Sequence, residues 1–112
     1  MRIALLNTSI ITSFGRFDYM PTTLQAVKDL LLNHPTDILS AIGHKATAEI
    51  LSELLATDIP MNRIDYKQEI DDIAIVFKLN RRVEEGRILS REDIEDIGYS
   101  FAILTKTEGY NE

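Results

Sequence analysis

The sequence contains no cysteine and only two histidines among its 112 residues. The lack of cysteine excludes disulfide bonds, thiol nucleophiles and zinc sites with sulfur ligands. The two isolated histidines, His34 and His44, make a poor metal site. We therefore predict chemistry that uses neither a metal ion nor a cofactor.

Long apolar runs are also missing at the amino terminus. Residues 1–7 hold only four consecutive apolar side chains. A secretion signal needs an apolar core of ~7–15 residues, and a membrane-spanning helix needs ~20. We therefore expect a cytoplasmic protein with no membrane partner.

Positive charge is scarce, with 12 lysines and arginines against 18 acidic residues and a formal net charge of −6. Binding to bulk nucleic acid normally needs a broad basic face, so we expect none, and a dimeric DNA-binding regulator is the weakest alternative. The arginines at 81, 82 and 87 are nevertheless grouped. A basic pocket for a small anion can therefore coexist with an acidic exterior.

The composition that remains is typical of a globular protein. Hydrophobic residues make up 45% of the chain and charged residues 27%. A chain of this length is expected to build one core, because domains usually hold ~100–150 residues. We therefore predict a single domain over residues 1–112, in which 106–112 form a loose tail.

Apolar patterning predicts helices interleaved with strands. Strands are expected at 2–6, 16–20, 37–42, 63–67, 73–77 and 99–104, and helices near 23–33, from about 44, and from 90 to 98. The first two strands are predicted to form a hairpin with a long loop, and 63–67 and 73–77 an antiparallel pair. The order β-β-α-β-α-β-β-α-β favours an α/β fold with a mixed sheet of about five to six strands flanked by helices.

Gly43 and His44 stand where a predicted strand gives way to a predicted helix. The free backbone N–H groups and the dipole of a helix amino terminus attract phosphate, so His44 would face a bound anion. A histidine at such a junction can equally be a cap or a packed polar side chain. Position alone does not make it catalytic.

The sequence "NRRVEEGR", residues 80–87, follows the apolar run that ends at residue 77. It places cations and carboxylates at the end of a buried strand, where the sites of α/β folds tend to lie. A solvated turn is the alternative interpretation of such a charge cluster.

Three stretches, "LLNTSI", "SAIGHKATAEILSELL" and "NRRVEEGRILSREDIEDIGY", resemble in order and spacing the viral ring nuclease family almost from end to end. These small dimeric proteins of archaeal viruses and bacterial mobile elements act as anti-CRISPRs against type III systems. They degrade cyclic tetra-adenylate, the messenger that activates type III effector nucleases. The resemblance implies a homodimer that binds cyclic tetra-adenylate.

The resemblance also implies catalytic residues. His44 matches the family's catalytic histidine, which is the general acid for the departing 5′ oxygen. Glu85 matches the catalytic glutamate, and Glu84 is the alternative if the loop register shifts by one residue. The expected products are linear di-adenylates with 2′,3′-cyclic phosphate ends, formed without a metal.

Ligand-binding residues follow from the same match. Arg63 and Arg82 match arginines that hold the ligand, and Gly43 belongs to the Gly-His element. Asn7 and Ser9 lie in the amino-terminal loop, which contributes a small hydroxyl residue in family members. A protein of the same fold that sequesters its ligand without cleaving it is the second hypothesis.

Overall fold

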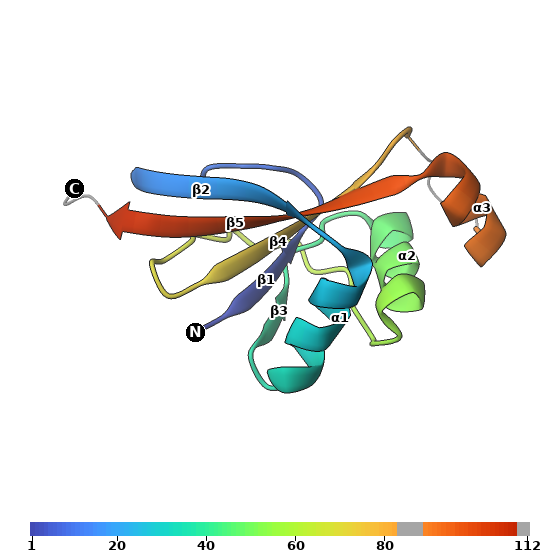
Figure 1. The fold of residues 1–112 in the computed structure, drawn as a ribbon, viewed down its shortest axis with the longest axis horizontal. Helices are drawn as coiled ribbons and strands as arrows, with labels where there is room; N and C mark the ends of the chain where they lie inside the picture. Colours follow the sequence, from blue (N-terminus) through green and yellow to red (C-terminus); the bar gives the residue numbers. More distant parts are fainter. Residues whose placement is uncertain (83–88, 110–112) are drawn as a thin grey trace.

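The computed structural model describes residues 1–82 and 89–109. Within them a five-stranded mixed sheet is flanked by helices, as predicted (Figure 1). In chain order the elements are β1 (Ile3–Leu6), β2 (Gly15–Thr22), α1 (Leu24–Asn33), β3 (Ile38–Ser40), α2 (Lys45–Leu55), β4 (Ile73–Leu79), α3 (Arg91–Ile97) and β5 (Tyr99–Gly109).

The strands lie in the order β2-β5-β4-β1-β3. β1 pairs in parallel with both β3 and β4, whereas β5 pairs antiparallel with β4 and with β2. All four residues of β1 are buried, so it suits the middle of the sheet, whereas most residues of β2 are exposed, which suits an edge. The predicted hairpin of the first two strands is therefore wrong, because β4 and β5 lie between them.

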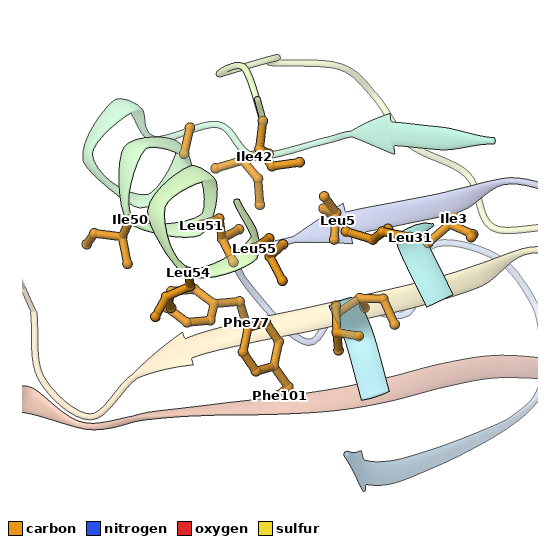
Figure 2. Close-up of a cluster of buried hydrophobic side chains, with 14 of the residues drawn as sticks. Ile3, Leu5, Leu31, Ile42, Ile50, Leu51, Leu54, Leu55, Phe77 and Phe101 are labelled. Carbon is orange, nitrogen blue, oxygen red and sulfur yellow. The ribbon is translucent and has the colours of Figure 1, made fainter. Parts of the chain in front are cut away.

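The main core lies between one face of the sheet and the helices. In Figure 2 the apolar side chains of α2 point toward Phe77 of β4 and Phe101 of β5. Ile94 of α3 is fully buried in the same cluster. The helix predicted to begin at about residue 44 is confirmed as α2, and its buried residues are Ala46, Ala48, Ile50, Leu51, Leu54 and Leu55.

The second face of the sheet is covered near Tyr66 by the irregular segment 63–72 rather than by a helix. Tyr66 packs there against Ala4, Val76 and Leu104. The predicted strand at 63–67 is wrong: of its two apolar residues Tyr66 is buried but Ile64 is 42% exposed, and the segment joins no ladder. The Gln68 side chain instead donates to the carbonyl of Leu104 over 2.8 Å.

Asp72 holds this segment to the start of the sheet. Its buried carboxylate accepts from the Arg2 side chain at 2.6 and 3.2 Å, from the Tyr66 hydroxyl at 2.9 Å and from the Glu69 backbone at 3.1 Å. Burial raises the pKa of Tyr66, so its hydroxyl stays protonated and able to donate. The network connects β1, β4 and the covering segment.

The prediction of a loose tail at residues 106–112 is wrong for its first part. Residues 106–109, expected in a loose tail, continue the strand because β2 offers a partner: Lys106 pairs with Phe17, and Gly109 with Gly15. Residues 110–112 of that predicted tail lie outside the described residues. In the described part of the chain, no helix has the length and apolarity needed to cross a membrane.

Helix starts were predicted more accurately. Ser90 and Asp93 form a complete capping box at the start of α3. His44 is the amino-terminal cap residue of α2, as expected. At α1 the cap is Thr23, which accepts from the Ala26 amide, and the Gln25 side chain donates to Asp29.

Candidate functional site

The carboxyl ends of β1, β3 and β4 lie at one edge of the sheet, because these three strands are parallel. Asn7 directly follows β1, and His44 ends the short turn after β3. Asn80, Arg81 and Arg82 follow β4. Segments far apart in the sequence therefore meet where α/β folds usually bind ligands.

A cavity of about 510 Å³ opens at this edge. Its volume lies within the ~300–1,000 Å³ of small-molecule sites. Its floor is apolar, with Ile50 and Phe77, and its polar side groups come from all three strand ends. The lining residues are Asn7, His44, Ala46, Thr47, Ile50, Phe77, Lys78, Leu79, Asn80, Arg81 and Arg82.

The cavity is positively charged although the whole chain carries −6. Lys78, Arg81 and Arg82 contribute exposed cationic side chains, and none of the described lining residues is acidic. The first turn of α2 adds N–H groups and the positive end of a helix dipole, because Ala46 and Thr47 also line the cavity. The arrangement favours an anion.

His44 is half-buried and does not use its side chain as a helix cap. Its backbone carbonyl begins α2 by accepting from the Ala48 amide over 3.1 Å. Its imidazole Nδ1 lies 3.3 Å from the hydroxyl of Thr47, one turn along the helix. The capping alternative considered for His44 is therefore wrong for its side chain, which is left for other chemistry.

Arg63 lies beside the cavity rather than in its lining. Its Nε donates to the carbonyl of Gly43 over 3.0 Å, and Arg63 is exposed. This bond fixes the covering segment to the turn that carries His44. An added Cβ at Gly43 would stand 3.6 Å from the Arg63 side chain, an ordinary van der Waals contact, so this bond does not require a glycine at position 43.

Ser9 reaches the site through Lys78. The Lys78 ammonium donates to the Ser9 hydroxyl over 3.0 Å, and Lys78 itself lines the cavity. An ammonium has three donors, so this bond leaves others for a ligand. The amino-terminal loop is thereby attached to the cation at the cavity wall.

Of the predicted site residues, Asn7, His44 and Arg82 line one cavity, and Gly43, Arg63 and Ser9 contact its surroundings. Glu85 and its alternative Glu84 lie outside the described residues. In the parts of the chain that the structure describes, no group of acidic or histidine side chains could hold a metal ion.

Sequence reasoning missed Thr47 and Lys78 as lining residues, and it pointed to Asn80 and Arg81 only as members of the charged segment 80–87. Two signals could have found them. Lys78 ends the apolar run of a central strand, and the carboxyl end of such a strand is the usual place for a ligand contact. Thr47 stands three residues after His44, a spacing at which helical side chains meet.

Comparison with known proteins places the chain among small viral and bacterial proteins. The family model described as STIV B116-like matches residues 3–101. Protein YddF of Bacillus subtilis strain 168 is 36% identical over 108 residues, which cover 96% of this chain and 100% of YddF. ORF117 of Acidianus two-tailed virus is 30% identical over 108 residues, covering 93% and 92% of the two chains.

The fold of this chain is similar to that of a solved structure. Protein B116 of Sulfolobus turreted icosahedral virus aligns with a TM-score of 0.81 and 23% identity, covering 94% of this chain and 99% of B116. At that identity the likeness shows the α/β architecture alone.

Proposed function

The chain belongs to the STIV B116-like family, and we propose that this protein is a metal-independent ring nuclease. It cleaves cyclic tetra-adenylate to linear di-adenylates with 2′,3′-cyclic phosphate ends. Removal of this messenger switches off type III CRISPR signalling. The proposal takes its substrate from the resemblance of the Gly-His and Arg-x-x-Glu-Gly elements to viral ring nucleases.

One observation carries the proposal: His44 and Arg82, 38 positions apart by number, line the same cationic cavity. A phosphodiester needs cations for its charge and an acid for its leaving oxygen, and this cavity offers both. The acidic exterior argues against a general nucleic-acid ligand.

The chemistry requires little besides positioning. The ribose 2′-hydroxyl gives its proton to water and attacks the adjacent phosphorus, forming the 2′,3′-cyclic phosphate, and the bond from phosphorus to the 5′ oxygen breaks. Alignment of these atoms contributes ~7–11 kcal/mol in favourable cases. His44 gives its proton to the departing 5′ oxygen, which is worth ~10²–10⁴-fold for a general acid.

The cations stabilise the phosphorane. Arg82 provides a planar fork of N–H donors for its oxygens, and Lys78 adds a point charge at the cavity wall. Arg63 keeps the His44 turn in place through the Gly43 carbonyl. Glu85 is proposed to keep the imidazole charged or oriented, as its family match implies.

A homodimer follows from the size of the substrate. A ring of four nucleotides is much larger than the drug-sized ligands that a cavity of about 510 Å³ encloses. Two copies related by a two-fold axis would present two such cavities to one ring, which is itself compatible with that symmetry. Each copy then makes one of the two cuts.

The test is a cleavage assay with a matched histidine control. The purified protein is incubated with excess cyclic tetra-adenylate and EDTA, and the products are separated by chromatography. We expect wild type and His34→Ala to yield di-adenylates and His44→Ala to leave the ring intact; His34 is paired with Asp37 at 3.5 Å and does not line the cavity. An intact ring with wild type, or equal cleavage by His44→Ala, rejects the proposal. Tight binding without turnover supports a sequestering protein instead.

A further inference from the structure

The proposed cleavage assigns no task to the Thr47 side chain, which makes a polar contact with the His44 ring. Its hydroxyl lies 3.3 Å from Nδ1. Both residues are half-buried and line the cavity. Both stand at the start of α2, which packs rigidly into the core through Ile50 and Leu51.

We infer that Thr47 is the positioning residue for His44: its hydroxyl engages Nδ1, so that Nε2 is the nitrogen that delivers the proton to the ligand. The inference rests on the proposed function, in which His44 is the acid. It gives the two ring nitrogens separate tasks. The hydrogen bond made by one nitrogen of a histidine commonly decides the protonation and role of the other.

A hydroxyl is well suited to this task, because it both donates and accepts. When the imidazole is charged, Nδ1 carries a proton and the Thr47 oxygen accepts it. When the ring has lost the Nε2 proton to the leaving oxygen, Nδ1–H still donates to the Thr47 oxygen. The same contact therefore holds the ring before and after the transfer, with no change in rotamer.

The side chain of threonine is also less flexible than that of serine. Its branched Cβ restricts χ1 within a helix, so the hydroxyl has few positions to choose from. The spacing of three residues places it on the same helix face as the cap residue His44. A serine at this position would keep the bond but hold it less firmly.

The experiment compares Thr47→Val, which keeps the shape and removes the hydroxyl, with Thr47→Ser, which keeps the hydroxyl. Thr57→Val is the matched control, because Thr57 is a half-buried threonine past the other end of α2 whose hydroxyl donates to Leu55. For Thr47→Val we expect the single-turnover cleavage rate to fall roughly 3- to 10-fold, as for the loss of one hydrogen bond, with the Kd for the ring unchanged. Thr47→Ser and Thr57→Val should stay within about two-fold of wild type.

A second readout does not depend on catalysis. Nitrogen NMR of the two histidine rings should show the His44 Nδ1 resonance shifted in Thr47→Val and restored in Thr47→Ser, with His34 unmoved. If wild type cleaves and Thr47→Val cleaves equally fast, the inference is wrong while the proposed function stands. If wild type does not cleave, the proposed function fails. An unshifted His44 Nδ1 resonance in Thr47→Val would separately refute the contact between the Thr47 hydroxyl and His44 Nδ1.

Discussion

The Asp72 carboxylate gives the sharpest prediction about stability. It is 3% exposed and accepts five hydrogen bonds, three from Arg2 and one each from Tyr66 and Glu69. In Asp72→Asn the side chain keeps its shape, but its charge is lost and an NH2 group faces donors. We expect the substitution to loosen the segment that covers the second face of the sheet.

The magnitude follows from the burial of the partners. Breaking a fully buried ion pair costs ~3–5 kcal/mol, and an unsatisfied buried polar group costs ~1–3 kcal/mol. The Arg2 side chain is 42% exposed and can turn to water, which lowers the first figure. We therefore expect a loss of about 2–4 kcal/mol, and at about 4 °C per kcal/mol a fall in Tm of roughly 8–16 °C.

The pH dependence of this loss has a definite sign. Burial alone would raise the pKa of Asp72, but hydrogen bonds from Arg2, the Glu69 amide and Tyr66 lower it below its ordinary value of 3.8. A lowered pKa stabilises the fold above the unfolded value and ceases to do so as pH falls through the folded value. The stability difference between wild type and Asp72→Asn should be full at neutral pH and shrink below about pH 4.

The assay is thermal unfolding by circular dichroism between pH 7 and pH 3. Asp71→Asn is the matched control, because Asp71 is adjacent and exposed; its Tm should stay near that of wild type. Equal Tm values for the two variants, or a difference that does not change with pH, would refute the role assigned to Asp72.

Three further predictions concern the core, a glycine and a cavity cation. Leu51→Ala removes a fully buried side chain between α2 and the sheet and should cost ~2–5 kcal/mol in urea unfolding. Gly98→Ala should cost ~1–3 kcal/mol and weaken ring binding in calorimetry, because Gly98 has φ +79° and an added Cβ would displace the Asn80 side chain, which lines the cavity. Lys78→Met should raise the Kd for cyclic tetra-adenylate several-fold. It should also reduce the slope of log K against log salt by ~0.7 for each phosphate that Lys78 neutralises. The control Lys28→Met removes the same charge from α1, away from the cavity, and should change neither the Kd nor the slope.

The sequence predicted the parts of the site that depend on local signals. Gly43 and His44 stand between a strand and an amphipathic helix, and the structure has that junction. Their meeting with Arg82 depends on the parallel pairing of β1 with β3 and β4, which the sequence patterns did not specify. Thr47 and Lys78 were missed because each also fits an ordinary helix or strand position.

Pairing partners were harder to predict, because they depend on contacts distant in sequence. β1 and β2 are neighbours along the chain, but burial on both faces places β1 between two parallel strands. The segment 63–67 alternates like a strand, yet its inward side chain Tyr66 packs on a sheet face. Ile64, the other apolar residue of the alternation, is 42% exposed, so the periodicity predicted neither a ladder nor the burial of both apolar side chains.

The most direct measurement of the central claim is phosphorus NMR of cyclic tetra-adenylate incubated with the protein in EDTA. A cyclic phosphate signal should replace the ring signal with wild type and with His34→Ala, and should not appear with His44→Ala. A cyclic phosphate signal of equal strength from His44→Ala, or an unchanged ring signal from wild type, would contradict the assignment of this cavity as a phosphodiester-cleaving site.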